Sequence, residues 1–351
     1  MTIHFFTYTG REEGCSRLRA FMVAEELKLR GFDTVVHSPP IPIISKTPWP
    51  RKGPVLFRML RSIVSIRKGD IIFLQRAIAN KYFSTAIFFY LMFFRNKMIF
   101  DFDDPIYLHN YFKTRLFSSM ANAVIVSSHG QREWALQFNS NVHLLHISLD
   151  VDAYKKFTKV YEPEQYPLVI GWVGTAHHNI EGLTILARIF RELLTRNPPV
   201  FIFRIIGSLK NKSVYDLFTG IHGLNVEFID ELDWLDSDCV PSAIQKFDIG
   251  VLPHRSDGPW NESKTALKML EYMACGVATV VSNFGEMPHV ISDGVDGFLA
   301  ESESDFSTKL LALLEDQNLR ARIGAAGQET ALKKFNFKDM VSKVEALIKA
   351  L

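Results

Sequence analysis

The stretch Lys264–Leu299 reads KTALKMLEYMACGVATVVSNFGEMPHVISDGVDGFL and decides the fold. Apolar residues recur on one face of its first part, which predicts a helix over 261–275. Gly276 suits a left-handed helix end, and the apolar run 277–282 that follows is typical of a buried strand. A helix that leads directly into a buried strand is half of the repeating unit of a parallel sheet.

The same alternation extends over the rest of the chain. The predicted strands cover 3–8, 34–37, 70–75, 98–101, 123–127, 168–173, 200–206, 225–229, 249–252 and 277–282. The pattern breaks over 150–166, where Pro163 and a run of charges interrupt it. We therefore expect an α/β fold with two doubly wound parallel sheets and a crevice at the carboxyl ends of the strands. The expected domains are 1–155 and 156–335, with a helix at about 336–351 packing back on the first.

Three charged residues of the predicted helix indicate an anion site. Lys264, Lys268 and Glu271 stand at i, i+4 and i+7 and share a face outside the apolar stripe. The lysines lie near the helix start, where Asn261 or Ser263 is the expected N-cap and free N–H groups attract anions. A diphosphate suits this end, and Glu271 suits the hydroxyls of a ribose. The alternative is an ordinary surface pair of Lys268 and Glu271, worth about 0.2–0.5 kcal/mol.

The quoted stretch resembles the donor-binding region of retaining GT-B glycosyltransferases, specifically the large family four. Three further segments resemble motifs of that family. They are GCSRLR over 14–19, IFDFDD over 99–104 and IGWVGT over 170–175. The resemblance covers nearly the whole chain and implies two Rossmann-like domains that face a central cleft.

The resemblance also implies roles for single residues. Glu271 would hold the nucleotide ribose, and Lys264, with Lys268, would meet the diphosphate. The backbone at Gly14 and at Gly174–Thr175 would approach the phosphates closely, which only small residues permit. Further donor-binding candidates are Ser16, Asn261 and Thr265. No cofactor and no metal are expected, since the nucleotide sugar is a substrate.

The chain departs from the family pattern where a second glutamate is usual, eight positions before the ribose-binding one. Ser263 stands there, and the neighbouring Glu262 is the candidate for a catalytic role. Asp103 and Asp104 are candidates for catalytic groups on the acceptor side. Asp101 and Asp103 have the spacing of a metal-binding pair, but no other clear ligands follow them.

Composition places the chain among globular intracellular proteins. Its 351 residues and apolar fraction of 47% suffice for two cores. Cys15, Cys239 and Cys275 are far apart and form no CxxC or Cys/His cluster, which argues against disulfides or zinc. We expect no signal peptide and no membrane span, since no apolar run reaches the roughly 18 residues that a span needs.

Charge is divided unevenly along the chain. Residues 1–155 hold 20 Lys/Arg and 12 Asp/Glu, whereas residues 156–351 hold 20 and 26. The basic amphipathic segment Pro54–Lys68 suits an anionic membrane surface, or it is a crossover helix with a solvated face. The basic residues proposed to meet a membrane or acceptor are Arg58, Arg61, Arg67 and Lys68. The apolar run Tyr82–Phe94 predicts a buried helix, with a membrane-embedded segment as the alternative.

These features predict a retaining glycosyltransferase that uses a nucleotide sugar and a glycan or lipid-linked acceptor. We expect it to act in the synthesis of a cell-surface polysaccharide or glycolipid, in the cytoplasm or on the inner face of the membrane. The alternatives are a nucleotide-sugar epimerase on the same fold and a non-catalytic nucleotide- or glycan-binding protein. Nucleic acid is not expected, because no recognition motif is visible. A dinucleotide oxidoreductase is disfavoured, because the first loop lacks GxGxxG.

Overall fold

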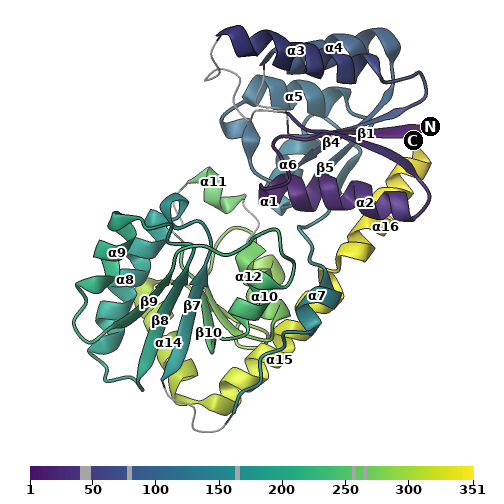
Figure 1. The fold of residues 1–351 in the computed structure, drawn as a ribbon. Coiled ribbons are helices and arrows are strands. Elements are labelled where there is room, and N and C mark those ends of the chain that lie inside the picture. The colour runs from purple at the N-terminus through teal and green to yellow at the C-terminus, as the bar shows by residue number, and fades with distance from the viewer. Residues whose placement is uncertain (40–48, 77–80, 163–166, 255–257, 264–266) are drawn as a thin grey trace. The chain divides into compact units, whose positions relative to one another are not determined.

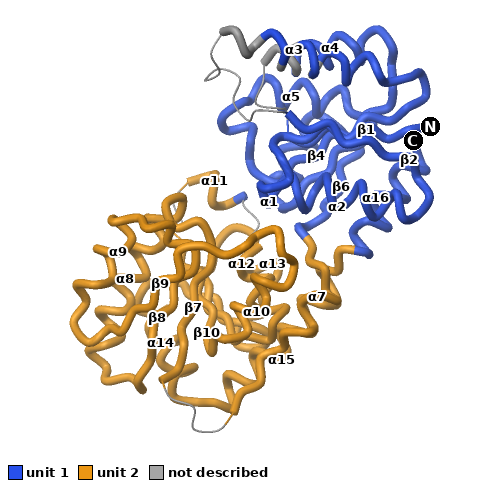
Figure 2. The backbone as a smooth tube through the Cα atoms, viewed as in Figure 1, with its two compact units in different colours: residues 1–147, 263–265, 338–351 blue, residues 148–262, 266–337 orange. Residues whose placement is uncertain are grey.

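The structure is a computed structural model that describes residues 1–39, 49–76, 81–162, 167–254, 258–263 and 267–351. The chain forms two compact units (Figures 1 and 2). Unit 1 comprises 1–147, 263–265 and 338–351, and unit 2 comprises 148–262 and 266–337. The chain thus leaves unit 1 earlier than the predicted boundary at residue 155. It also returns to unit 1 at 263–265, which the sequence analysis did not anticipate.

Unit 1 contains a six-stranded parallel sheet in the order β2-β1-β3-β4-β5-β6. Its strands are β1 (Thr2–Phe6), β2 (Asp33–His37), β3 (Ile71–Gln75), β4 (Lys97–Phe102), β5 (Ala123–Val126) and β6 (Val142–Leu144). Its helices are α1 (Gly14–Ser16), a π-helical turn (Arg17–Phe21), α2 (Met22–Leu29), α3 (Trp49–Val64), α4 (Lys81–Phe94), α5 (Tyr111–Met120), α6 (His129–Leu136) and α16 (Phe337–Ala350), whose first residue belongs to unit 2. The order reverses between β1 and β3, which is the switch point of a doubly wound sheet.

Helices cover both faces of this sheet. On one face, Ile63 of α3, Ile87 of α4 and Phe117 of α5 pack against strand residues such as Ile72 and Phe100. On the other side of the unit, α16 is tied to the end of α2. The Arg30 side chain donates to Glu345 at 3.1 Å and to the Lys338 carbonyl at 3.0 Å. These bonds hold the last helix of the chain on unit 1.

The prediction that Tyr82–Phe94 is a buried helix is wrong for one side of α4. Ile87 and Leu91 are buried against the sheet, whereas Phe89, Phe93 and Phe94 are exposed. The reason is that α4 belongs to a single layer of helices, so only its side toward the sheet joins the core formed by the described residues. None of the helices in the described parts of the chain combines the length and hydropathy needed to cross a bilayer.

Unit 2 contains a second six-stranded parallel sheet, in the order β12-β11-β10-β7-β8-β9. Its strands are β7 (Leu168–Val173), β8 (Phe201–Ile206), β9 (Asn225–Ile229), β10 (Ile249–Leu252), β11 (Ala278–Ser282) and β12 (Phe298–Ala300). Its helices are α7 (Val151–Lys155), α8 (Ile180–Leu194), α9 (Lys212–Thr219), α10 (Cys239–Ile244), α11 (Pro259–Glu262), α12 (Leu267–Ala274), α13 (Met287–Val290), α14 (Glu303–Glu315) and α15 (Gln317–Lys334). Here the order reverses between β7 and β10.

Two buried clusters sandwich this second sheet. One joins α8 and α14 to the strands through residues such as Phe190 and Leu310. The other joins α7, α10 and α12 through residues such as Met269 and Tyr272. The Tyr272 hydroxyl accepts from Val173 N at 3.0 Å, so α12 is fixed to the end of β7 by a buried hydrogen bond. Helix α12 is thereby held at the switch point.

Candidate functional site

The switch point of unit 2 is built from two glycine loops. Gly174, after β7, has φ +146°, and Gly207, after β8, has φ +89°, a region that disfavours side chains. Gly174 N donates to the Ile206 carbonyl at 3.0 Å, and Ala176 N donates to the Gly207 carbonyl at 3.0 Å. A Cβ added at Gly207 would overlap the carbonyl oxygen of Gly174. The two loops therefore lie against each other with backbone alone, as close approach to a ligand requires.

The side chain of Lys268 lies across the first of these loops. A Cβ added at Gly174 would overlap Lys268 Cε and lie 3.0 Å from its Nζ. The ammonium group is 5.0 Å from the centroid of the Trp172 ring and donates to Asn179 Oδ1 at 3.3 Å. The structure thus brings together Lys268 and Gly174, which are far apart in sequence. It adds Trp172 and Asn179, which the sequence analysis did not select.

Glu271 lies one turn further along α12 and is half-buried. The hydroxyl of Tyr154, from α7, donates to Glu271 Oε1 at 2.9 Å. Lys268 and Glu271 therefore each have a partner from another element, Asn179 and Tyr154, which distinguishes them from a simple surface pair. A cation and a carboxylate held one turn apart can bind the diphosphate and the ribose of one nucleotide.

Thr175 and the two histidines after it form the exposed rim of the β7 loop. The Thr175 carbonyl accepts from His178 N at 3.2 Å and from Asn179 Nδ2 at 2.8 Å. Asn179 thus links this carbonyl to the ammonium group of Lys268. Lys264 and Thr265, the other predicted contacts of the diphosphate, lie outside the described residues.

The helix predicted over 261–275 is interrupted at Ser263, and residues 264–266 lie outside the described part of the chain. Helix α11 ends at Glu262, and Ser263 is a turn before α12 begins at Leu267. Asn261 is half-buried and Glu262 is exposed. Their carbonyl groups rest on the turn after β11, since a Cβ added at Gly285 would lie 2.8 Å from Glu262 O and 3.0 Å from Asn261 O.

Contacts within unit 1 explain the break at Ser263. Tyr107 donates its hydroxyl to Ser263 Oγ at 3.1 Å, and the Ser263 carbonyl accepts from Ser128 Oγ and Gln131 Nε2, each at 2.8 Å. A Cβ added at Gly130 would lie 2.8 Å from Ser263 Oγ. Ser263 is buried and its polar atoms are occupied, so this position serves unit 1 as a structural anchor.

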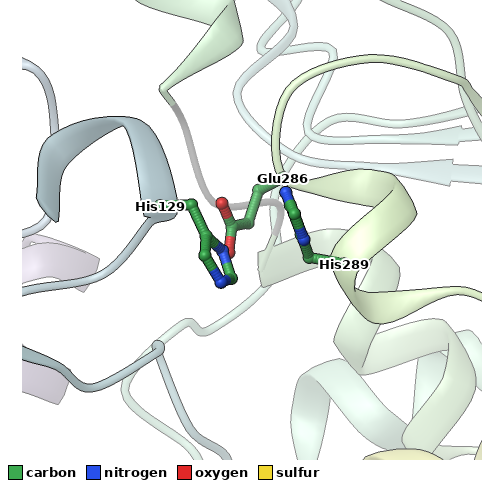
Figure 3. A group of neighbouring side chains, drawn as sticks. All are labelled: His129, Glu286 and His289. Atoms are coloured by element: carbon green, nitrogen blue, oxygen red, sulfur yellow. The ribbon is translucent and has the colours of Figure 1, made fainter. Parts of the chain in front are cut away.

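Glu286 is a residue near the quoted glycine turn that the sequence analysis did not select. It is buried at the N-cap of α13, and His289 follows one turn later and is exposed (Figure 3). The sequence feature that could have indicated Glu286 is its position directly after Gly285, at the carboxyl end of β11. His129, also drawn in Figure 3, starts α6 of unit 1.

The first loop of unit 1 is closed by hydrogen bonds around Ser16. Ser16 Oγ accepts from Thr9 N at 3.1 Å and donates to Gln75 Oε1 at 3.0 Å. Ser16 is fully buried, so its side chain fixes the loop. Gly14 starts α1, and the nearest atom to an added Cβ there is Arg17 Nη2 at 4.0 Å. There is room for a side chain at position 14, so packing within the protein does not require glycine there.

Asp103 and Asp104 are both paired with Arg76. Arg76 Nε lies 2.7 Å from Asp103 Oδ1, and Nη2 lies 2.6 Å from Asp104 Oδ2. Burial alone would raise the pKa of Asp103, but the charge and hydrogen bond of Arg76 together with the charge of Arg19 outweigh burial, so the pKa lies below its ordinary value. A carboxylate held ionised in this way is a poor proton donor.

Asp101, the other half of the Asp101-x-Asp103 pair, has a different partner. It is buried and forms an ion pair with Arg19, which also donates to the Leu145 carbonyl at 2.7 Å. Burial raises the pKa of Asp101 to about 6 despite this guanidinium. The three aspartates of this strand end are therefore bound to the buried Arg19 and the partly buried Arg76.

The four basic residues predicted to meet a membrane or acceptor are exposed. Arg58 and Arg61 lie on α3, and Arg67 and Lys68 lie in the turn before β3. The backbone of this turn is fixed, since Arg67 N donates to Asp70 Oδ2 at 2.8 Å.

The second unit is similar in sequence to known proteins. Residues 167–316 match the family model described as glycosyl transferases group 1. An uncharacterized glycosyltransferase of Methanocaldococcus jannaschii is 29% identical over 153 residues, which are 43% of this chain and 41% of that protein. A Campylobacter jejuni enzyme, N,N'-diacetylbacillosaminyl-diphospho-undecaprenol alpha-1,3-N-acetylgalactosaminyltransferase, is 35% identical over 26% of this chain and 23% of its own length. The matches thus span less than half of these two relatives.

The whole chain is similar in fold to a solved structure. HepE of Anabaena, in complex with UDP, has a TM-score of 0.74 with 15% identity and full coverage of both chains. The two doubly wound parallel sheets are therefore those of the GT-B fold, and residues 167–316 are similar to group 1 glycosyltransferases.

Proposed function

We propose that this chain transfers a sugar from a nucleotide-sugar donor to a glycan or lipid-linked acceptor, with retention of configuration. The observation that carries the proposal is the placement of Lys268 across Gly174, with Glu271 one turn away. The ammonium group would stabilise the leaving diphosphate, and the backbone N–H groups of the glycine loops would share that charge. Glu271 would accept hydrogen bonds from the ribose.

The proposed setting is the synthesis of a cell-surface polysaccharide or glycolipid at the inner face of the cytoplasmic membrane. The Campylobacter relative, named for an undecaprenol-linked acceptor, and HepE, solved with UDP, support this setting by similarity. Asp103 and Asp104 remain the proposed catalytic groups on the acceptor side, and Glu262 remains a further catalytic candidate. Lys264 remains a proposed second contact of the diphosphate.

A donor screen followed by site variants tests the reaction. Thermal shift with UDP, GDP, ADP and dTDP sugars identifies the donor, since ligand at about 100 times its Kd adds about 2.7 kcal/mol. Lys268→Ala and Glu271→Ala should lower kcat/KM for that donor by about 100-fold while the protein stays folded. Lys246→Ala and Glu315→Ala, at exposed positions of unit 2, are the matched controls.

The products decide between this proposal and other reactions. Transfer with retention gives a product whose anomeric configuration, read by NMR, equals that of the donor. Isomerisation of a sugar nucleotide in the absence of any acceptor would replace the proposal with an epimerase. Near-normal turnover in both Lys268→Ala and Glu271→Ala would reject the assigned donor site.

A further inference from the structure

Three neighbouring helices of unit 1 expose large apolar side chains on the side away from the sheet. These are Phe57 and Val64 on α3, Phe89 and Phe93 on α4, and Phe112 and Leu116 on α5. Val64, Phe93 and Phe112 are 81%, 78% and 83% exposed. The solvent side of a surface helix is normally polar, and extended apolar patches mark interaction surfaces. We call this set of six residues the α3–α5 face.

The three helices form one continuous layer. Residues of α3, α4 and α5 share a core with the same side of the sheet, so their opposite sides point the same way. The Tyr90 hydroxyl of α4 donates to the Ile66 carbonyl, just past α3, at 3.1 Å, and Lys113 of α5 donates to Ser84 of α4 at 3.3 Å. Figure 1 shows α3 and α4 side by side, with α5 next to them.

The charges around the α3–α5 face are of one sign. Residues 34–100 contain eleven Lys/Arg and a single acidic residue, Asp70, which is buried. Arg58 and Arg61 lie between the exposed apolar residues of α3, and Arg115 lies between those of α5. Each of these arginines is exposed. A face on which exposed apolar side chains alternate with cations complements a bilayer whose head groups are anionic.

We propose that the α3–α5 face binds the surface of an anionic lipid bilayer, with its aromatic side chains entering the head-group region and its arginines contacting lipid phosphates. A protein partner would instead be expected to supply acidic side chains and a defined shape. The continuous layer of helices, with exposed cations on two of them, favours an extended anionic surface. This inference extends the proposed setting at a membrane, but it does not depend on the proposed reaction.

Vesicle co-sedimentation of the full chain tests the proposal without any sugar nucleotide. The probes are phosphatidylcholine vesicles with and without phosphatidylglycerol. We expect at least tenfold stronger binding to the anionic vesicles. Each cation near such a surface contributes about fivefold, so Arg58→Glu/Arg61→Glu should weaken binding by about 25-fold or more. Arg191→Glu/Lys246→Glu, at exposed positions of unit 2, changes the net charge equally and should have little effect.

The apolar contribution is tested separately. Phe93→Asp should weaken vesicle binding by at least about tenfold, while Leu235→Asp, at a similarly exposed apolar position of unit 2, should not. Phe93→Trp should give a blue shift of tryptophan emission on anionic vesicles only. All these side chains are exposed, so the thermal unfolding temperature of each variant should equal that of the wild type. The same measurement shows whether each variant is folded.

Three results would overturn the proposal: equal binding to both vesicle types, no binding to either, or equal loss in the control variants. A dimer in solution that Phe93→Asp dissociates, without vesicle binding, would assign the face to self-association instead. Vesicle binding by a protein that transfers no sugar would reject the proposed reaction and leave this inference standing. Sugar transfer to a soluble acceptor without vesicle binding would reject this inference and leave the proposed reaction standing.

Discussion

Replacement of Gly174 by alanine tests the centre of the proposed donor site. The added Cβ would overlap Lys268 Cε, and the backbone would keep a φ of +146° that alanine tolerates poorly. The strain costs about 1–2 kcal/mol. Displacing Lys268 costs a further 1–2 kcal/mol or so, because its bond to Asn179 and its contact with the Trp172 ring are lost. We expect Gly174→Ala to lower the free energy of unfolding by about 2–4 kcal/mol.

Gly223→Ala is the matched control for the strain. Gly223 also lies in unit 2 and has φ +82°, but an added Cβ meets nothing within 4 Å. Gly223→Ala should lower the free energy of unfolding only by the backbone strain, which is about 1–2 kcal/mol. A double-mutant cycle then isolates the overlap: Lys268→Ala removes the side chain in the way, so the double variant should be about 1–2 kcal/mol more stable than additivity predicts.

The measurements are urea unfolding and binding of whichever nucleoside diphosphate the wild-type protein prefers. We expect Gly174→Ala to bind that nucleotide at least about tenfold more weakly, since a charged hydrogen bond is worth about 1.5–3 kcal/mol. Equal stability losses in Gly174→Ala and Gly223→Ala, together with an additive cycle, would refute the placement of Lys268 over the loop. Unchanged nucleotide affinity would refute its role in the donor site.

Three further predictions concern the polar side chains of Tyr154, Arg76 and His37. Tyr154→Phe should weaken nucleotide binding by about fivefold through the loss of the bond that orients Glu271, as isothermal calorimetry can measure. Arg76→Met should lower the free energy of unfolding by about 3–5 kcal/mol, because it leaves the buried carboxylate of Asp103 without its partner. Burial and the neighbouring His4 lower the pKa of His37 to about 4, so acid favours the unfolded chain, in which this histidine protonates more readily. Stability should therefore fall by about 2 kcal/mol from about pH 7 to pH 5, and His37→Gln should reduce that fall in urea titrations.

The sequence predicted most of the sheet framework, because buried parallel strands are continuous apolar runs with clear ends. Three predicted strands, Leu168–Val173, Asn225–Ile229 and Ile249–Leu252, match β7, β9 and β10 residue for residue. The strands β6 and β12 were missed. Each has three residues, which is too short for an apolar pattern to be distinguished from a loop.

Other errors arose where distant contacts override local patterns. The uniform apolar composition of Tyr82–Phe94 carries no periodicity that would separate its buried side from its exposed side. The break at Ser263 depends on Tyr107, Ser128 and Gln131, which are more than a hundred residues away in sequence. The partners of Lys268 could not be predicted for the same reason, since only the folded sheet brings Trp172 and Asn179 to α12.

Some of the departures from local rules fall at places for which a function is proposed. A folded chain tolerates a positive φ, an outward phenylalanine or an interrupted helix when the feature serves a purpose beyond stability. Gly174 and Gly207 adopt a positive φ where a diphosphate is proposed to lie, and the α3–α5 face exposes aromatic residues where a bilayer is proposed. The helix break at Ser263 differs from these features, because the hydrogen bonds of Ser263 to Tyr107 and Gln131 explain the break structurally. The α3–α5 face is thus the region whose sequence stability does not explain, and it is where loss of function should separate from loss of folding.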